Sequence, residues 1–306
     1  MASGKLWVII NPAAGKGKAA RRRPRIERLL RESGRDFEII ETKGPGDAIE
    51  IARGLPLGPG DATVAAGGDG TCNEVANGLL ARGGSEAPVL GTLPIGRGND
   101  FASTPGIPED MGRAARVLAA GKTRVLDAGF VKGGFFPEGR YFVNGIGVGF
   151  DARVGFEAAR MRIKSGLSYA LCALLLVAKN EPSPVIRITC DGRETTIPAT
   201  LVSIVNGRRM GGSFYMGPRA VLDDGLLDIC AVRHQESRLA LARILASYTK
   251  GTQAGRPGVS AGSGSSFRLE ALEGALAAHC DGETICREGR ELDVTCAPGA
   301  LRLIGA

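Results

Sequence analysis

The sequence predicts an α/β protein made of two parts, a three-layer α/β/α domain with a parallel sheet and an antiparallel β-sandwich domain. Apolar runs alternate with helical segments through the first 120 residues, which is typical of a parallel sheet. From Arg124 onward, short apolar stretches alternate with Gly, Pro, Asp and Asn turns, which is typical of antiparallel strands. A chain of 306 residues is also long for a single core. We expect domains at residues 1–127 and 128–306, with the last strand returning to the first domain.

The first half predicts a regular alternation of strands and helices. Strands are expected at residues 5–10, 37–42, 62–66 and 88–93, and helices near residues 17–33, 46–54, 71–81 and 109–120. Such βαβ units indicate a Rossmann-like domain, in which ligands bind at the carboxyl ends of the parallel strands. The loops that follow these strands should therefore converge on one edge; they are residues 11–17, Thr42, residues 67–73 and residues 94–100.

In the second half, helices near residues 155–180 and 236–250 interrupt the strands, and the Gly/Ser-rich residues 251–266 predict a mobile surface loop. Residues 167–178 form an apolar run of 12, which is too short to span a bilayer. We expect a buried helix there, with a membrane-touching or substrate-lining helix as the alternative. Because the N-terminus lacks the pattern of a signal peptide, a soluble protein is expected.

The composition favours certain binding partners but does not distinguish among them. The chain carries 39 basic and 32 acidic residues, a net charge of +7, which favours an anionic partner: a nucleotide, a nucleic acid or an acidic lipid surface. The 7 cysteines include no C-x-x-C pair, which indicates reduced thiols in a cytosolic protein. The 2 histidines lie far apart in the sequence and argue against a histidine-based zinc site.

A Gly-rich segment, GGDGT at residues 67–71, joins a predicted strand to a predicted helix. Its glycines leave backbone amides accessible, and the positive end of the helix dipole adds attraction for an anion, so the segment predicts a phosphate-binding loop. Asp69 would repel a phosphate unless a metal ion or a proton stood between them, which indicates Mg-nucleotide chemistry. An ordinary strand-to-helix turn is the alternative.

Two further segments suit anion binding. Residues 11–18, NPAAGKGK, follow a predicted strand and precede a helix, although they do not match the P-loop or G-x-G-x-x-G patterns. Arg97, in the loop after the strand at residues 88–93, can grip phosphate oxygens with its planar guanidinium. The basic run RRRPRIER at residues 21–28 is expected to be a solvated helix face, with attraction to an acidic membrane as the alternative.

Six motifs occur in a fixed order: N-P-x-x-G at residues 11–15, GGDGT-x-NE at 67–74, P-x-G-x-x-ND-x-A at 94–102, F-x-N-x-x-x-x-G-x-DA at 142–152, DDGLLD at 223–228 and DGE at 281–283. With this set the sequence resembles the diacylglycerol-kinase catalytic-domain family. It is most similar to the bacterial soluble lipid kinases, with sphingosine and ceramide kinases as more distant relatives. The motifs cover nearly the whole chain.

The resemblance implies a nucleotide in the cleft between the two domains. The matching cofactor-binding positions are Asn11, Pro12, Ala13, Ala14, Gly15, Thr42, Gly67, Gly68, Asp69, Gly70, Thr71, Cys72, Asn73 and Arg97. Arg97 stands where the family often has threonine. By resemblance Glu283 is the general base, with Asp281 and Asp69 completing the catalytic set. The DDGLLD segment resembles a structural Mg²⁺ loop, whose ligands would be the carboxylate of Asp224 and the carbonyls of Val221 and Leu226.

The sequence therefore predicts an ATP- and Mg²⁺-dependent kinase acting on a lipid hydroxyl, such as that of diacylglycerol. We expect a cytoplasmic protein that contacts the inner membrane surface transiently and binds no nucleic acid; a homodimer is left open. A kinase for a soluble acceptor, similar to an NAD kinase, and a non-catalytic nucleotide or lipid sensor are the alternatives. The residues alone also allow DGE to be a hairpin turn and DDGLLD a turn before a strand.

Overall fold

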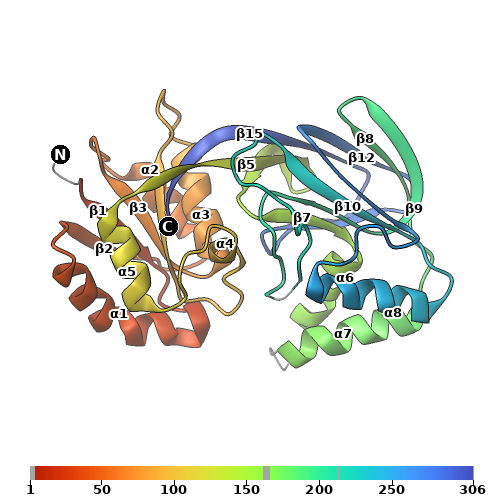
Figure 1. Cartoon of the computed structure of the whole chain (residues 1–306), viewed down its shortest axis with the longest axis horizontal. Helices are drawn as coiled ribbons and strands as arrows, with labels where there is room; N and C mark the ends of the chain where they lie inside the picture. The colour runs from red at the N-terminus through yellow and green to blue at the C-terminus, as the bar shows by residue number, and fades with distance from the viewer. Residues whose placement is uncertain (1–3, 161–165, 213, 306) are drawn as a thin grey trace.

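The computed structural model describes residues 4–160, 166–212 and 214–305, with side chains for all of these except residues 166–170. Two parts of different architecture lie side by side along the long axis (Figure 1). The first has a parallel sheet between helices and the second is an antiparallel β-sandwich, so the predicted fold class is confirmed.

The first part contains a parallel sheet in the order β4-β3-β1-β2. Its elements are β1 (Leu6–Ile10), α1 (Ala14–Glu32), β2 (Phe37–Glu41), α2 (Asp47–Gly54), β3 (Ala62–Gly67), α3 (Asp69–Leu80), β4 (Val89–Pro94), α4 (Asp100–Ser103) and α5 (Met111–Ala120). Strands β1 and β3 are fully buried, because α1 and α5 pack on one face of the sheet while α2 and α3 pack on the other. Apolar runs without polar alternation are typical of such doubly covered strands.

The second part is a sandwich with a single large apolar core between its sheets. Its elements are β5 (Thr123–Gly133), β6 (Phe136–Phe142), β7 (Gly145–Gly149), α6 (Phe150–Arg160), α7 (Gly166–Lys179), β8 (Val185–Cys190), β9 (Arg193–Val205), β10 (Leu227–Arg233), α8 (Arg238–Ser247), the 3₁₀ helix η1 (Tyr248–Lys250), β11 (Val259–Gly264), β12 (Ser266–Glu273), β13 (Leu276–Cys280), β14 (Glu283–Gly289) and β15 (Glu291–Ile304). Helices α6, α7 and α8 lie together on one side of the sandwich (Figure 1).

Strand β15 belongs to both parts. It pairs antiparallel with β12 in the sandwich and with β5, and then parallel with β4 at Arg302↔Val89 and Leu303↔Leu90. Figure 1 shows β5 and β15 running together between the two parts. Asp127 lies inside β5, so the chain crosses between the parts within a strand. The domain limits at residues 1–127 and 128–306 stay a prediction.

Three local expectations need correction. The single helix expected at residues 155–180 is two helices, α6 and α7, and residues 161–165 between them lie outside the described part of the chain. The loop expected at residues 251–266 contains β11, because its small residues pair with β10 as an edge strand. The helix at residues 167–178 is not buried as expected, because Leu171, Leu174 and Leu175 are 45%, 65% and 50% exposed.

Within the described residues, none of the helices combines the length and the apolar character needed to traverse a bilayer.

Candidate active site

A pocket of about 320 Å³ lies at the carboxyl ends of β1, β3 and β4, the edge at which ligands bind in open parallel sheets. Backbone and small side chains from four segments form its wall. The lining residues are Asn11, Ala13, Ala14, Gly15, Gly44, Pro45, Gly68, Gly70, Thr71, Glu74 and Gly96. The Gly-rich loop, the N-P-x-x-G segment and the loop after β4 therefore converge as expected, and we call this pocket the cradle.

The cradle depends on backbone approach that only glycine permits. Gly15 has φ +60°, and a Cβ there would lie 2.5 Å from the carbonyl oxygen of Ile95. A Cβ on Gly96 would lie 2.6 Å from the Cα of Gly68, so the loops after β3 and β4 touch through their main chains. Because no side chain separates these loops, their amides can approach a ligand directly.

Helix α3 turns its amino end toward the cradle. Gly68 is its N-cap, and among the described side chains none caps that end with a hydrogen bond. Asn11 holds the neighbouring loop in place: its Oδ1 accepts from the Ala13 amide at 3.0 Å and its Nδ2 donates to Thr71 Oγ1 at 3.3 Å. Uncapped amides at the positive end of a helix dipole are a suitable site for a phosphate group.

Several predicted nucleotide-binding residues lie outside the cradle wall. Thr42 is buried at the end of β2, where its amide donates to Ile10 O at 2.9 Å, and Cys72 faces the core with Sγ 3.2 Å from Thr92 Oγ1. Gly67 is packed under the Thr71 side chain, and Pro12 and Arg97 lie on loops beside the wall, with Arg97 exposed. The structure therefore does not support side-chain contacts from Thr42 or Cys72 to a nucleotide.

Two carboxylates meet beside the cradle. Asp69 accepts from the Phe101 amide at 3.0 Å, and a Cβ placed on Gly98 would lie 3.0 Å from Asp69 Oδ2 and 3.2 Å from Asp100 Oδ2. Burial raises the pKa of both carboxyl groups, and the charge of Asp69 helps to raise that of Asp100 to about 6. The buried Asp100 Oδ1 has no hydrogen-bond partner. Neighbouring carboxyl oxygens suit a hard divalent cation such as Mg²⁺, which would compete with Arg209, 3.7 Å from Asp100 Oδ1.

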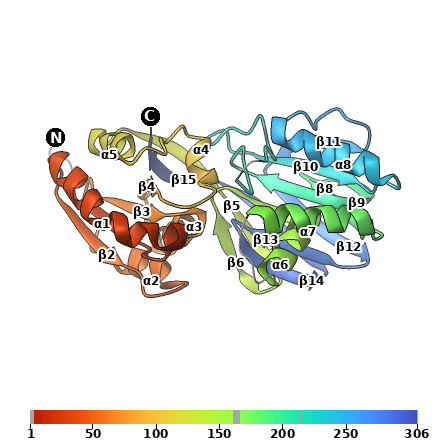
Figure 2. The same ribbon diagram turned by 90° about the horizontal axis from the view of Figure 1, so that it is seen from below.

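Arg140 connects the end of the sandwich to α3. Its Nη2 donates to Asn73 Oδ1 at 2.8 Å and to Glu283 Oε1 at 2.8 Å, and its guanidinium lies 5.1 Å from the Phe136 ring centroid. Burial raises the pKa of Glu283, and the charge of Arg140 opposes that effect. Asn73 and Glu283 are far apart in the sequence, but a single guanidinium group now joins them. Figure 2 shows α3 at the junction of the two parts, next to β6.

Asp281, the first residue of DGE, is buried and saturated with hydrogen bonds. It accepts from the amides of Val143 at 2.9 Å, Asn144 at 3.2 Å and Gly145 at 2.8 Å, and from Asn73 Nδ2 at 2.8 Å. A carboxylate that holds four donors in fixed positions is poorly placed to take part in proton transfer. The structure therefore favours a positioning role for Asp281 over the catalytic role expected from the sequence.

The DDGLLD segment forms a turn before β10. Asp127 is buried beneath it and accepts from the amides of Gly225 and Gly299, both at 2.7 Å. Asp224 is exposed, its Oδ1 accepts from the Leu226 amide at 3.1 Å, and burial together with the Asp224 charge raises the pKa of Asp228. An all-oxygen set in a locally acidic turn suits Mg²⁺.

Magnesium at this turn would need main-chain ligands. In the described part of the chain, no three His, Cys, Asp or Glu side chains gather closely enough to hold a metal by themselves. The carbonyls of Val221 and Leu226 would have to supply the remaining oxygens, so these metal ligands stay a prediction.

Comparison with known proteins gives consistent matches along the whole chain. Residues 5–131 match the model of the diacylglycerol kinase catalytic domain, and residues 144–305 match the YegS C-terminal NAD kinase beta sandwich-like domain. The chain is 32% identical over 285 residues to the Escherichia coli protein named "Probable lipid kinase YegS", covering 90% of this chain and 88% of that one. The chain belongs to the diacylglycerol kinase catalytic-domain family.

Other relatives agree with this assignment. A Chromohalobacter salexigens protein named "Probable lipid kinase YegS-like" is 31% identical over 247 residues, which are 79% of this chain and 75% of the relative. A crystal structure from Bacillus anthracis, assigned as a diacylglycerol kinase, aligns with 100% of this chain and 96% of its own at a TM-score of 0.79 and 25% identity. Membership of this lipid kinase family makes the chain a kinase-type transferase.

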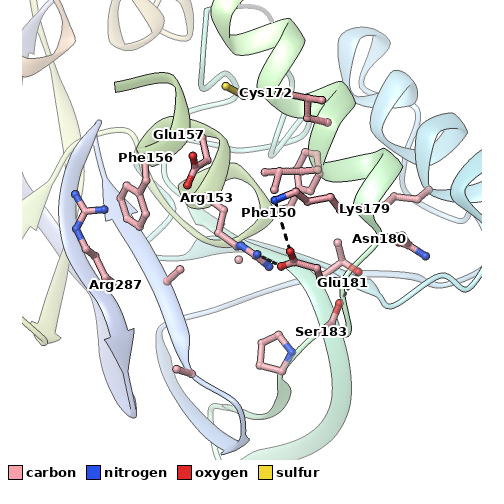
Figure 3. A pocket seen from close by; sticks show the side chains of 18 of the residues that line it. Phe150, Arg153, Phe156, Glu157, Cys172, Lys179, Asn180, Glu181, Ser183 and Arg287 are labelled. Atoms are coloured by element: carbon pink, nitrogen blue, oxygen red, sulfur yellow. Dashed lines mark hydrogen bonds and ion pairs between the residues drawn. The ribbon is translucent and has the colours of Figure 1, made fainter. Parts of the chain in front are cut away.

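A larger cavity, of about 750 Å³, lies between α6, α7 and the β13–β14 hairpin. Figure 3 shows Phe156 and Arg287 on one side of it and Cys172 on α7. The guanidinium of Arg287 lies 4.6 Å from the Phe156 ring centroid, and Glu181 pairs with Arg153 and, at 3.9 Å, with Lys179. The cavity is thus lined by aromatic, aliphatic and charged side chains.

Sequence reasoning missed three residues that shape this kinase site. Glu74 accepts from the amides of Gly46 at 3.0 Å and Ala48 at 3.3 Å, which fixes α2 beside the cradle. Arg140 and Arg209 are the basic partners of Glu283 and Asp100. No local pattern in the sequence marks these two arginines.

Proposed function

We propose that this protein is an ATP- and Mg²⁺-dependent lipid kinase that transfers the γ-phosphoryl group of ATP to a hydroxyl of a lipid such as diacylglycerol. One observation carries the proposal. Glu283, from the second domain, is joined through Arg140 to Asn73 of α3, whose amino end borders the cradle. A carboxylate is thus tied to the same helix whose amino end borders the anion-binding loop, and phosphoryl transfer to a hydroxyl needs both groups close to the substrates.

The proposed reaction follows from these positions. The triphosphate lies in the cradle, where the amides after Gly68 and those near Gly15 offset charge on the phosphate oxygens. Glu283 takes the proton of the lipid hydroxyl while that oxygen attacks the γ-phosphorus, and the bond to the ADP oxygen breaks. Arg140 favours the charged form of Glu283, so a carboxylate is present to receive the proton.

Magnesium would be held at two places in this proposal. Asp69 and Asp100 suit the cation that accompanies ATP, which when bound neutralises charge on the transferred phosphoryl group. Asp224 with the Val221 and Leu226 carbonyls suits a structural ion that would fix the turn before β10. Both sets consist of oxygen ligands, as Mg²⁺ prefers.

The lipid assignment is supported by the cavity under α7. Strand β14 begins at Glu283 and reaches Arg287 and Glu288, which line the cavity. Four residues of strand span roughly 13 Å, so a molecule that places its hydroxyl at Glu283 could extend apolar chains toward the cavity. A lipid of the inner membrane surface, reached by transient contact from the cytoplasm, fits this arrangement better than a small soluble acceptor.

The test is incubation of the purified protein with labelled ATP, Mg²⁺ and a panel of diacylglycerols, sphingoid bases and NAD. Labelled lipid is expected with the wild type. Glu283→Gln should lower kcat by a factor on the order of 100 or more and leave nucleotide binding intact.

Two results would count against the proposal in different ways. Labelled NAD without labelled lipid would favour a soluble-acceptor kinase, and nucleotide binding with no labelled product at all would favour a sensor. The control variant is Glu273→Gln, at an exposed position on β12, away from Arg140 and outside the cavity wall.

A further inference from the structure

Helix α7 presents leucines where a soluble helix normally presents polar groups. It packs against α6 and α8, and in Figures 1 and 2 these helices lie together on one side of the sandwich. Leu171, Leu174 and Leu175 are 45%, 65% and 50% exposed, and exposed Lys179 follows one turn later. These positions recur every three to four residues, so they form one exposed stripe along the helix, of which Leu175 and Lys179 also border the cavity.

Helix α8 continues this surface with basic side chains. Leu239 is 59% exposed, and Arg238 and Arg243 are exposed on the same helix. The sequences of α7 and α8, GLSYALCALLLVAK and RLALARILAS, contain three basic residues and no Asp or Glu. We call the exposed residues of these two helices, Leu171, Leu174, Leu175, Lys179, Arg238, Leu239 and Arg243, the α7–α8 face.

We infer that the α7–α8 face docks onto an anionic lipid bilayer, with its leucines entering the headgroup boundary and its basic side chains contacting lipid phosphates. Leucines grouped on a surface indicate an interaction site, because isolated soluble proteins rarely leave such groups uncovered. A helix with apolar and basic side chains on its outer surface is the usual form of an interfacial membrane helix. Each basic residue near an anionic leaflet adds attraction that salt weakens.

Charge argues against a second copy of this chain as the occupant. A two-fold dimer through this face would bring the same patch of both copies together. Arg238 and Arg243 of each copy would then face two helices that carry no acidic residue. Like charges across an interface oppose association, whereas the phosphates of a membrane complement them.

Docking in this orientation would also place the cavity at the lipid surface. Leu175 and Leu176 of α7 and Leu241 of α8 line the cavity, so the helices that contact the bilayer also form a wall of the cavity. A lipid could pass from the bilayer into the cavity without crossing water. This last point rests on the proposed lipid kinase function, but the docking itself does not.

Flotation with lipid vesicles tests the docking without any need for catalysis. Wild-type protein should bind vesicles of phosphatidylcholine with phosphatidylglycerol, bind vesicles of phosphatidylcholine alone more weakly, and lose binding to the anionic vesicles as salt rises. Leu174→Asp and Leu239→Asp should each lower the partitioning of the protein onto the vesicles about 10-fold or more. Each change replaces a leucine that would enter the headgroup boundary with a negative charge, which anionic lipid repels. Arg238→Gln with Arg243→Gln should lower it roughly 25-fold at low salt.

Leu272→Asp is the matched control, since Leu272 is 44% exposed on β12, outside the α7–α8 face. It should bind like the wild type. The inference is overturned if the wild type does not float, if Leu174→Asp floats as well as Leu272→Asp, or if the wild type sediments as a dimer that Leu174→Asp separates.

A second readout separates this inference from the proposed function. On short-chain diacylglycerol dispersed below its micelle concentration, Leu174→Asp should match the wild type, while on anionic vesicles its rate should fall with its binding. Equal rates of the two proteins on vesicles would also overturn the docking. Vesicle binding that depends on the α7–α8 face, without phosphorylation of any lipid, would support the docking and refute only the kinase proposal.

Discussion

Replacing Asp100 by asparagine should stabilise the magnesium-free protein more at pH 8 than at pH 5. The Asp100 side chain is only 7% exposed, its Oδ2 accepts from the Gly212 amide at 2.7 Å, and Arg209 lies 3.7 Å from its Oδ1. Burial, and then the Asp69 charge, raise its pKa from 3.8 to about 6. The folded protein therefore holds a proton here that the unfolded chain has already lost, so stability falls as pH rises from 3.8 to about 6.

The size of the effect follows from that displacement of the pKa. A change from 3.8 to about 6 corresponds to about 3 kcal/mol of lost stability once both states are ionised. Asparagine removes this cost and can still accept from Gly212, and the attraction of Arg209 is already included in the pKa of about 6. A gain of about 2–3 kcal/mol at pH 8, or a few degrees in Tm, and about half of that at pH 5 is expected.

The gain in stability is measured by thermal unfolding of the wild type and Asp100→Asn at pH 5 and pH 8, with and without Mg²⁺. If Asp69 and Asp100 hold Mg²⁺, the metal should raise the Tm of the wild type at pH 8 more than that of Asp100→Asn. Asp36→Asn, at an exposed position, is the control and should show no such pH dependence. Loss of stability in Asp100→Asn by the same amount at both pH values would refute the reasoning.

Three further outcomes are expected. Arg140→Gln should move the acidic limb of the pH profile of kcat/KM to higher pH, because burial and the charges of Glu74 and Asp281 then raise the pKa of Glu283 unopposed. A lower kcat with the acidic limb at the same pH as in the wild type would contradict this. Gly96→Ala should raise the KM for ATP about 10-fold or more, since its Cβ would lie 2.6 Å from Gly68, whereas Gly54→Ala, with open space at its Cβ, should not. Asp127→Ala should lower the free energy of unfolding, measured by urea denaturation, by about 3 kcal/mol or more, because two buried amides lose a charged acceptor. The exposed control Glu288→Ala should lose less than about 1 kcal/mol. A loss that small in Asp127→Ala would contradict the prediction.

The parts of the fold and site that were predictable are those set by local sequence. Strand β1 was recognisable as an apolar run, and the cradle loops as glycine-containing turns after strands, because strand burial and backbone approach require those residue types. The carboxyl ends of parallel strands then brought the loops to one edge. These rules need no knowledge of which distant segments touch.

The parts that were missed depend on contacts between distant segments. Arg140 lies in a hairpin strand with no motif, and its link between Asn73 and Glu283 exists only because β6 packs beside α3. The donors to Asp281 were hidden for the same reason. Apolar composition could not show that α7 turns leucines outward, since a helix in a core and a helix on a lipid surface have similar sequences.

The double membership of β15 has a consequence for folding during synthesis. Residues 291–304 complete the sheet of the first part beside β4 as well as the sandwich beside β12. Until the ribosome releases that segment, β4 remains an open edge with unpaired amides and carbonyls. The part of the chain that is synthesised first therefore has an exposed strand edge that can associate with other strands. The two halves are thereby coupled in time as well as in space, and neither can reach its final hydrogen bonding long before the other.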